Sequence, residues 1–113
     1  MGGAGGVAGG GTGGGTNPTP PTVSVTAPAQ GSTVSGQVNI TASATDNTGI
    51  SRVEFLVDNA LRGTVTTGTN GVFTYAWSTT GESNGTHSIQ ARAYNTANLS
   101  ATSSAVSVTV SNT

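Results

Sequence analysis

The side chains that could carry out chemistry are few. His87 is the only histidine of the 113 residues, cysteine is absent, and only four residues are acidic. A Ser-His-Asp arrangement would need His87 beside one of the serines and an aspartate. His87 lies two residues before Ile89 in an alternating run, which predicts a packing or hydrogen-bonding residue that faces the core at the start of a strand. We therefore expect no nucleophilic catalysis.

Two pairs of oxygen-bearing residues, Asp46-Asn47 and Asp58-Asn59, flank one predicted strand. Their positions at opposite ends of that strand separate the carboxylates too far for two-carboxylate glycoside hydrolysis. Oxygen ligands suffice for Ca²⁺, although neither loop supplies three carboxylates. Asp and Asn also favour turns for conformational reasons. We expect no catalytic residue and no cofactor, and calcium at Asp46, Asn47, Asp58 and Asn59 stays an open alternative.

The composition excludes several classes of partner. Charged residues make up only 6% of the chain, with three arginines against four acids and a net charge of −1. Three scattered arginines cannot neutralise a row of phosphates, so we expect no nucleic-acid partner. No apolar run reaches the roughly 18 residues of a membrane span. Without cysteine there are no thiolate zinc sites and no disulfides.

The first 21 residues differ in composition from the rest. Ten of the 18 glycines lie between Gly2 and Gly15, and three of the four prolines follow at positions 18, 20 and 21. Gly-rich chains are flexible and Pro-rich chains are extended. We therefore expect residues 1–21 to form a disordered linker, with a span of about 25 Å, and residues 22–113 to form one domain. The start lacks the features of a signal peptide, and we expect Met1 to be an added start on a piece of a longer protein.

From Thr22 onward, Val, Ile and Thr alternate with polar residues in short runs separated by turn-forming residues. No window has a helical period. Seven such runs predict strands around Val23–Val25, Val38–Ala44, Val53–Val57, Arg62–Thr67, Phe73–Trp77, Ile89–Ala93 and Val106–Val110. This spacing is typical of an antiparallel β-sandwich or small barrel.

The aromatic residues divide between the predicted core and the predicted surface. Phe73, Tyr75 and Trp77 share one face of their strand. We expect Trp77 to pack in the core, whereas a carbohydrate-binding site would need it exposed to stack on a sugar ring. Tyr94 has the opposite, solvent-facing parity.

Pairing of the sixth predicted strand with the third would place Arg92 near Glu54 and Arg52. That arrangement predicts a candidate contact surface, with an ordinary surface ion pair as the alternative. The residues of this surface are Arg52, Glu54, Gln90, Arg92 and Tyr94.

Several motifs occur in an order that resembles the bacterial immunoglobulin-like domains of secreted multimodular proteins. The resemblance spans residues 21–110 and includes V-x-F-x-V-D and G-x-H-x-I-x-A-x-A. A Y-x-x-W motif is also present with Tyr75 one place out of register. The matching segments are Pro21–Pro28, Gly31–Val34, Val38–Asp46, Ile50–Asp58, Phe73–Trp77 and Gly85–Ala93.

The resemblance implies a seven-stranded antiparallel immunoglobulin-like β-sandwich that is secreted or on the cell surface. Members of this family are spacer or accessory modules of glycoside hydrolases, chitinases, proteases and adhesins, usually without catalytic residues. We therefore expect a monomeric, non-catalytic spacer whose partners are neighbouring domains, in a parent protein that degrades polysaccharide. The alternatives are a carbohydrate-binding module, with polysaccharide as partner, and a cell-surface adhesion domain. Many relatives carry an Asp after the sixth strand where this chain has Tyr94–Asn98, so no calcium role is expected there.

Overall fold

The computed structural model describes residues 18–112, so residues 1–17 of the disordered linker predicted over residues 1–21 lie outside that range. Within it the chain is built from strands and one short 3₁₀ turn, η1 (Thr79–Gly81). No helix in residues 18–112 is long and apolar enough to span a bilayer. The strands are β1 (Thr22–Ala27), β2 (Thr33–Val34), β3 (Gln37–Thr45), β4 (Ile50–Val57), β5 (Ala60–Val65), β6 (Val72–Ser78), β7 (Gly85–Asn95), β8 (Ser100–Thr102) and β9 (Val106–Val110).

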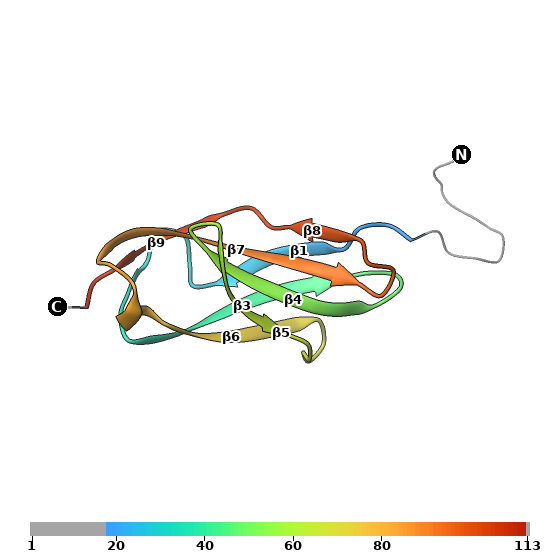
Figure 1. Ribbon diagram of the computed structural model, residues 1–113, viewed down its shortest axis with the longest axis horizontal. Coiled ribbons are helices and arrows are strands. Elements are labelled where there is room, and N and C mark those ends of the chain that lie inside the picture. The colour runs from blue at the N-terminus through green and yellow to red at the C-terminus, as the bar shows by residue number, and fades with distance from the viewer. Residues whose placement is uncertain (1–17, 113) are drawn as a thin grey trace.

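The strands form two facing sheets (Figure 1). The small sheet has the order β1-β3-β6, and the large sheet has the order β2-β9-β7-β4-β5, with β8 paired to β7. The seven predicted strands correspond to β1, β3, β4, β5, β6, β7 and β9, so the predicted sandwich is confirmed. The short strands β2 and β8 were not predicted, because two or three residues are too few to display a period of two.

One strand pairing differs from the antiparallel arrangement expected throughout. Strand β2 pairs with β9 in parallel, with Thr33 opposite Thr109 and Val34 opposite Val110. The other strand pairs are antiparallel. Parallel pairing needs a long connection between the partners, and here almost the whole domain lies between β2 and β9.

The core lies between the two sheets and follows the alternation of the strands. Trp77 is 1% exposed, which confirms its predicted place in the core. The Phe55 ring of the large sheet stacks on the Tyr75 ring of the small sheet at 5.7 Å between centroids, so the two layers meet through aromatic contact. The other large, fully buried apolar side chains are Ile40, Val53, Val57, Ile89, Val108 and Val110.

The chain enters and leaves this sandwich at opposite ends (Figure 1). We call the end where residues 18–21 lead into β1, beside the β3–β4 and β7–β8 turns, the N-terminal pole. The other end, where β9 finishes near η1 and the β4–β5 hairpin, is the C-terminal pole. The polar residues of interest gather at these two poles and on the outer face of the large sheet.

Candidate functional site

At the C-terminal pole, His87 is held between two acceptors. Its Nδ1 lies 2.5 Å from Oδ2 of Asp58, and its Nε2 lies 2.7 Å from the carbonyl oxygen of Ser83. His87 is 6% exposed, on the core-facing parity that the sequence predicts. A carbonyl accepts and cannot donate, so Nε2 carries a proton. The Ser83 carbonyl, and then the carboxylate of Asp58, raise the pKa of His87 above its usual value.

This arrangement differs from a Ser-His-Asp site. In such a site a histidine nitrogen must be free to accept the proton of a serine hydroxyl. The Nε2 of His87 faces a backbone carbonyl in place of a hydroxyl. His87 therefore acts in this structure as a double donor that joins the β4–β5 hairpin to the loop before β7.

Next to His87, Glu82 accepts hydrogen bonds from two side chains that come from different strands. Arg62 of β5 donates to both carboxylate oxygens, at 2.7 Å from Nε and 3.0 Å from Nη2. Nε1 of Trp77 donates at 3.0 Å. The Arg62 bond is the main reason that the pKa of Glu82 falls to about 2, against the opposing effect of burial. Because Trp77 is a core residue, its bond to Glu82 connects the loop at the C-terminal pole to the hydrophobic core.

Asp58, one of the calcium candidates, has both carboxylate oxygens in use. Oδ2 contacts His87, and Oδ1 accepts the Ser88 N–H at 2.9 Å. Burial opposes ionisation of Asp58, but these bonds outweigh it and lower the pKa. Asp58 and Asn59 form the two-residue β4–β5 loop with φ of 53° and 67°, the left-handed pair of a type I′ hairpin. The structure thus gives this pair a conformational role.

At the N-terminal pole, Asp46 is used in the same way. Its Oδ2 accepts the N–H and the hydroxyl of Thr48, at 2.8 and 2.6 Å, and its Oδ1 accepts Nδ2 of Asn95 at 3.2 Å. Burial opposes ionisation of Asp46, but these bonds lower the pKa. Asn47 lies exposed in the same turn. Within residues 18–112, no three His, Asp or Glu side chains gather as a metal ion would require.

Asn95 connects this pole to the incoming chain. The residue is fully buried. Its Oδ1 accepts the N–H groups of Ala97 and Leu99 at 2.9 Å each, and its Nδ2 donates to the carbonyl of Thr19 at 2.8 Å. With the bond to Asp46, the side-chain amide of Asn95 thus donates two hydrogen bonds and accepts two, which is its full capacity. The bond to Thr19 joins residue 19 to the sandwich, ahead of β1.

Asn112 does the same at the C-terminal pole. Its Oδ1 accepts the Gly36 N–H at 2.9 Å, and its Nδ2 donates to the Thr79 carbonyl at 2.9 Å. Its own N–H donates to Oδ1 of Asn84 at 2.8 Å. An asparagine therefore fastens the chain at each pole.

The residues of the predicted contact surface lie together on the outer face of the large sheet. Strands β4 and β7 pair with Arg52 opposite Tyr94 and Glu54 opposite Arg92. Glu54 contacts both arginines, at 3.2 Å from Arg92 Nη1 and 3.7 Å from Arg52 Nε. The guanidinium carbon of Arg52 lies 3.7 Å from the Tyr94 ring centroid, a cation–π contact. Gln90 follows on the same face and donates to the Ser103 carbonyl at 3.2 Å.

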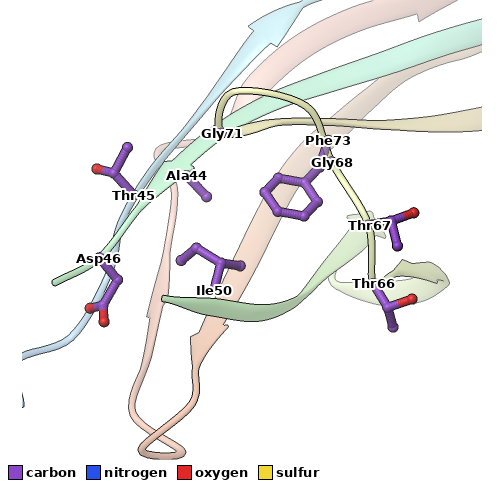
Figure 2. A pocket seen from close by; sticks show the side chains of 9 residues that line it. All are labelled: Ala44, Thr45, Asp46, Ile50, Thr66, Thr67, Gly68, Gly71 and Phe73. Atoms are coloured by element: carbon purple, nitrogen blue, oxygen red, sulfur yellow. The ribbon is translucent and has the colours of Figure 1, made fainter. Parts of the chain in front are cut away.

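A pocket of about 510 Å³ opens at the N-terminal pole between the ends of the two sheets. In Figure 2 the side chains of Ala44, Ile50 and Phe73 point toward one another across it, while Thr66 and Thr67 point outward. Apolar side chains thus meet across the pocket, while Thr45, Asp46, Thr66 and Thr67 add polar groups to its lining. Phe73 is 6% exposed, so its ring offers no open platform for a sugar.

Two sheets facing each other with these connections define an immunoglobulin-like β-sandwich. The sequence matches the family described as bacterial Ig domain over residues 21–91. The chain therefore belongs to the bacterial Ig domain family, which confirms the resemblance found in the motifs.

Comparison with solved structures supports the same fold. Fibronectin(III)-like modules of Clostridium thermocellum CbhA are similar with a TM-score of 0.67 and 24% identity, over 79% of this chain and 94% of that chain. The endo-beta-1,4-mannanase from Thermotoga petrophila matches with a TM-score of 0.68 and 16% identity, over 84% of this chain but only 20% of the mannanase. An engineered protein matches with a TM-score of 0.59 and 23% identity, over 84% of this chain and 21% of that one. No curated protein matches the chain.

Proposed function

We propose that this chain is a non-catalytic spacer module of a secreted bacterial multidomain protein that acts on polysaccharide. The family is one line of support. The similarity to part of an endo-beta-1,4-mannanase supports the link to polysaccharide, and the similarity to modules of CbhA supports a role as one module among several. A spacer has to hold its neighbouring domains at a set separation, which requires that the chain be fixed where it enters and leaves the domain.

The observation that carries the proposal is the way the chain joins the sandwich at both poles. Asn95 holds the Thr19 carbonyl at one end, and Asn112 is held by Gly36 and Thr79 at the other. Pro21 is buried, so the junction is also packed. Because β-sandwich strands run between the poles, segments attached at the two ends leave from fixed points a full strand length apart.

The separation of the two junctions can be measured by pulsed EPR. The chain has no cysteine, so Pro20→Cys with Ser111→Cys provides two unique sites for nitroxide labels, and both positions are exposed. We expect one narrow distance distribution, because each label sits next to an asparagine-held junction.

Asn95→Ala should broaden that distribution by releasing Thr19. Thr96→Ala is the matched control, since Thr96 follows Asn95 directly and its hydroxyl donates to the Thr48 carbonyl of the neighbouring β3–β4 turn. A distribution as broad in the unsubstituted labelled chain as in Asn95→Ala would contradict a fixed separation and with it the spacer role.

A further inference from the structure

The charges of the chain are unevenly distributed over the molecule. Arg62 is paired with Glu82 at the C-terminal pole, where Asp58 also faces His87. Asp46 lies in the turn at the N-terminal pole. The remaining charged side chains, Arg52, Arg92 and Glu54, share the outer face of the large sheet. That face has a charge of +1 on a chain whose net charge is −1.

The two arginines on this face still have hydrogen-bonding capacity. Glu54 sits between them with a side chain 15% exposed, whereas the side chains of Arg52 and Arg92 are 37% and 36% exposed. The acid is therefore the more deeply placed of the three groups. A guanidinium has five N–H donors. Arg52 forms a loose ion pair with Glu54, at 3.7 Å from Nε, whereas Arg92 donates to Glu54 at 3.2 Å from Nη1, to the Thr102 hydroxyl at 3.4 Å from Nε, and to Tyr94. One carboxylate lies within ion-pair distance of both cations, and more than a third of each arginine side chain remains exposed, so a second carboxylate can reach them.

The surroundings favour a hydrated ligand. Tyr94 lies under the Arg52 guanidinium and restricts its orientation, which lowers the entropy lost on binding. On the neighbouring strand β8, Ser100 lies opposite Tyr94 and Thr102 lies opposite Arg92, so hydroxyl residues border the two side chains. The fully buried centre of a protein–protein interface is usually apolar and depleted of charge. The centre of this face is charged, which suits a polymer of hydroxyls and carboxylates better than a protein.

We propose that the outer face of the large sheet binds an acidic polysaccharide, with carboxylates of successive uronic acid units bound to Arg52 and Arg92. A single carboxylate on half-exposed arginines binds weakly, because solvent screens the pair. A chain of such units presents many carboxylates at high effective concentration. The proposal does not depend on the spacer role, since it concerns a face between the two poles.

Polygalacturonate, a polymer of galacturonic acid, is the probe, and neutral dextran is the matched polymer without carboxylates. In affinity electrophoresis of the full chain, we expect polygalacturonate to retard migration, dextran to have no effect, and added salt to abolish the retardation. The double variant Arg52→Ala/Arg92→Ala should lose at least about tenfold in affinity, the equivalent of about 1.4 kcal/mol. Thr74→Ala, at an exposed position on the opposite sheet, should bind like the unsubstituted chain.

Glu54→Gln separates a binding role from a merely structural one. It removes the competing internal carboxylate, so binding of polygalacturonate should strengthen severalfold even though two ion pairs are lost. Weaker binding by Glu54→Gln would overturn the proposal, as would unchanged binding by the folded double arginine variant. Equal retardation by poly-glutamate peptide would assign the face to acidic proteins and would also overturn it.

Discussion

Nδ1 of the His87 imidazole on β7 lies 2.5 Å from Oδ2 of Asp58 in the β4–β5 loop, and the two groups form an ion pair when the imidazole is protonated. The second ring nitrogen donates to the Ser83 carbonyl. Both partners accept, so the folded state favours the doubly protonated ring. The folded environment of the single histidine therefore raises its pKa and favours its protonated form, so its protonation is linked to folding.

This linkage predicts how stability depends on pH. The pKa of His87 is higher in the folded state than the ordinary value of about 6.5 expected when unfolded. The stabilisation is then complete below about pH 6.5 and is lost as pH rises through the folded-state pKa. Urea unfolding at a series of pH values from 6 to 9 should show a falling free energy of unfolding. His87→Gln should be less stable at pH 6 and should lack the fall, and an equal slope in that variant would contradict the assignment.

Glu82, at the same pole, makes the free energy of unfolding depend on pH in the acid range. Its folded pKa of about 2 lies below the unfolded value, so its contribution is present above about pH 4.5 and is lost as pH falls toward 2. At pH 7, Glu82→Gln should cost about 1–3 kcal/mol, because Arg62 loses a charged partner. Glu54→Gln is the control and should cost less than about 1 kcal/mol, since Glu54 has only looser contacts at 3.2 and 3.7 Å, whereas Glu82 accepts three bonds of 2.7 to 3.0 Å. Equal losses in the two variants, measured by urea unfolding, would show that the Glu82 contacts contribute no more than surface pairs.

Gly63 is required by the contact between the two sheets. A Cβ at this position would overlap the ring of Tyr75, whose hydroxyl donates to the Arg62 carbonyl at 3.0 Å. Gly63→Ala should therefore destabilise the domain by about 1–3 kcal/mol through overpacking. Gly81→Ala is the matched control, because a Cβ there meets nothing within 4 Å. Thermal unfolding of the two variants, followed by circular dichroism, tests the difference, and equal midpoints would contradict the overlap.

Calcium should have no effect on stability. Each carboxylate oxygen of Asp46 and Asp58 already accepts an internal hydrogen bond or ion pair. An ion that binds only the folded state would raise the thermal midpoint with its concentration. We expect the same midpoint in millimolar CaCl₂ and in EDTA. A rise in CaCl₂ that Asp46→Asn or Asp58→Asn abolishes would establish a calcium site at that residue.

The sequence predicts those parts of the molecule that depend on local alternation. The period of two in the long strands places Trp77 and His87 toward the core and Tyr94 on the outer face. The expected pairing of the third and sixth predicted strands places Arg92 near Glu54 and Arg52, and β4 and β7 do pair, with Glu54 opposite Arg92. The position of Tyr94 opposite Arg52 was not predicted. Parity is set by neighbouring residues, and strand pairing follows from the family pattern.

The contacts that the sequence does not reveal join segments far apart in the chain. Glu82 lies in a loop, and nothing in its neighbourhood signals that Arg62 and Trp77 converge on it. Asn95 and Asn112 read as ordinary turn and terminal residues, because the backbone groups that they bind come together only after the sheets have packed. Leu56 has outward parity yet is only 6% exposed. The alternation of a strand predicts which face of the sheet a side chain lies on, but it does not predict how far neighbouring side chains cover that face.

The parallel pairing of β2 and β9 determines how the domain would respond to tension. Backbone bonds from Gly31 to Ser107, from Thr109 to Ser32 and from Ser111 to Val34 join the last strand to the segment after β1. A pull applied at the two poles acts along the strand axes, so these bonds, and those between β9 and β7, are sheared together and are not opened one after another. Shearing requires several bonds to break at once, so detachment of the C-terminal strand should need a higher force than opening the same bonds one by one.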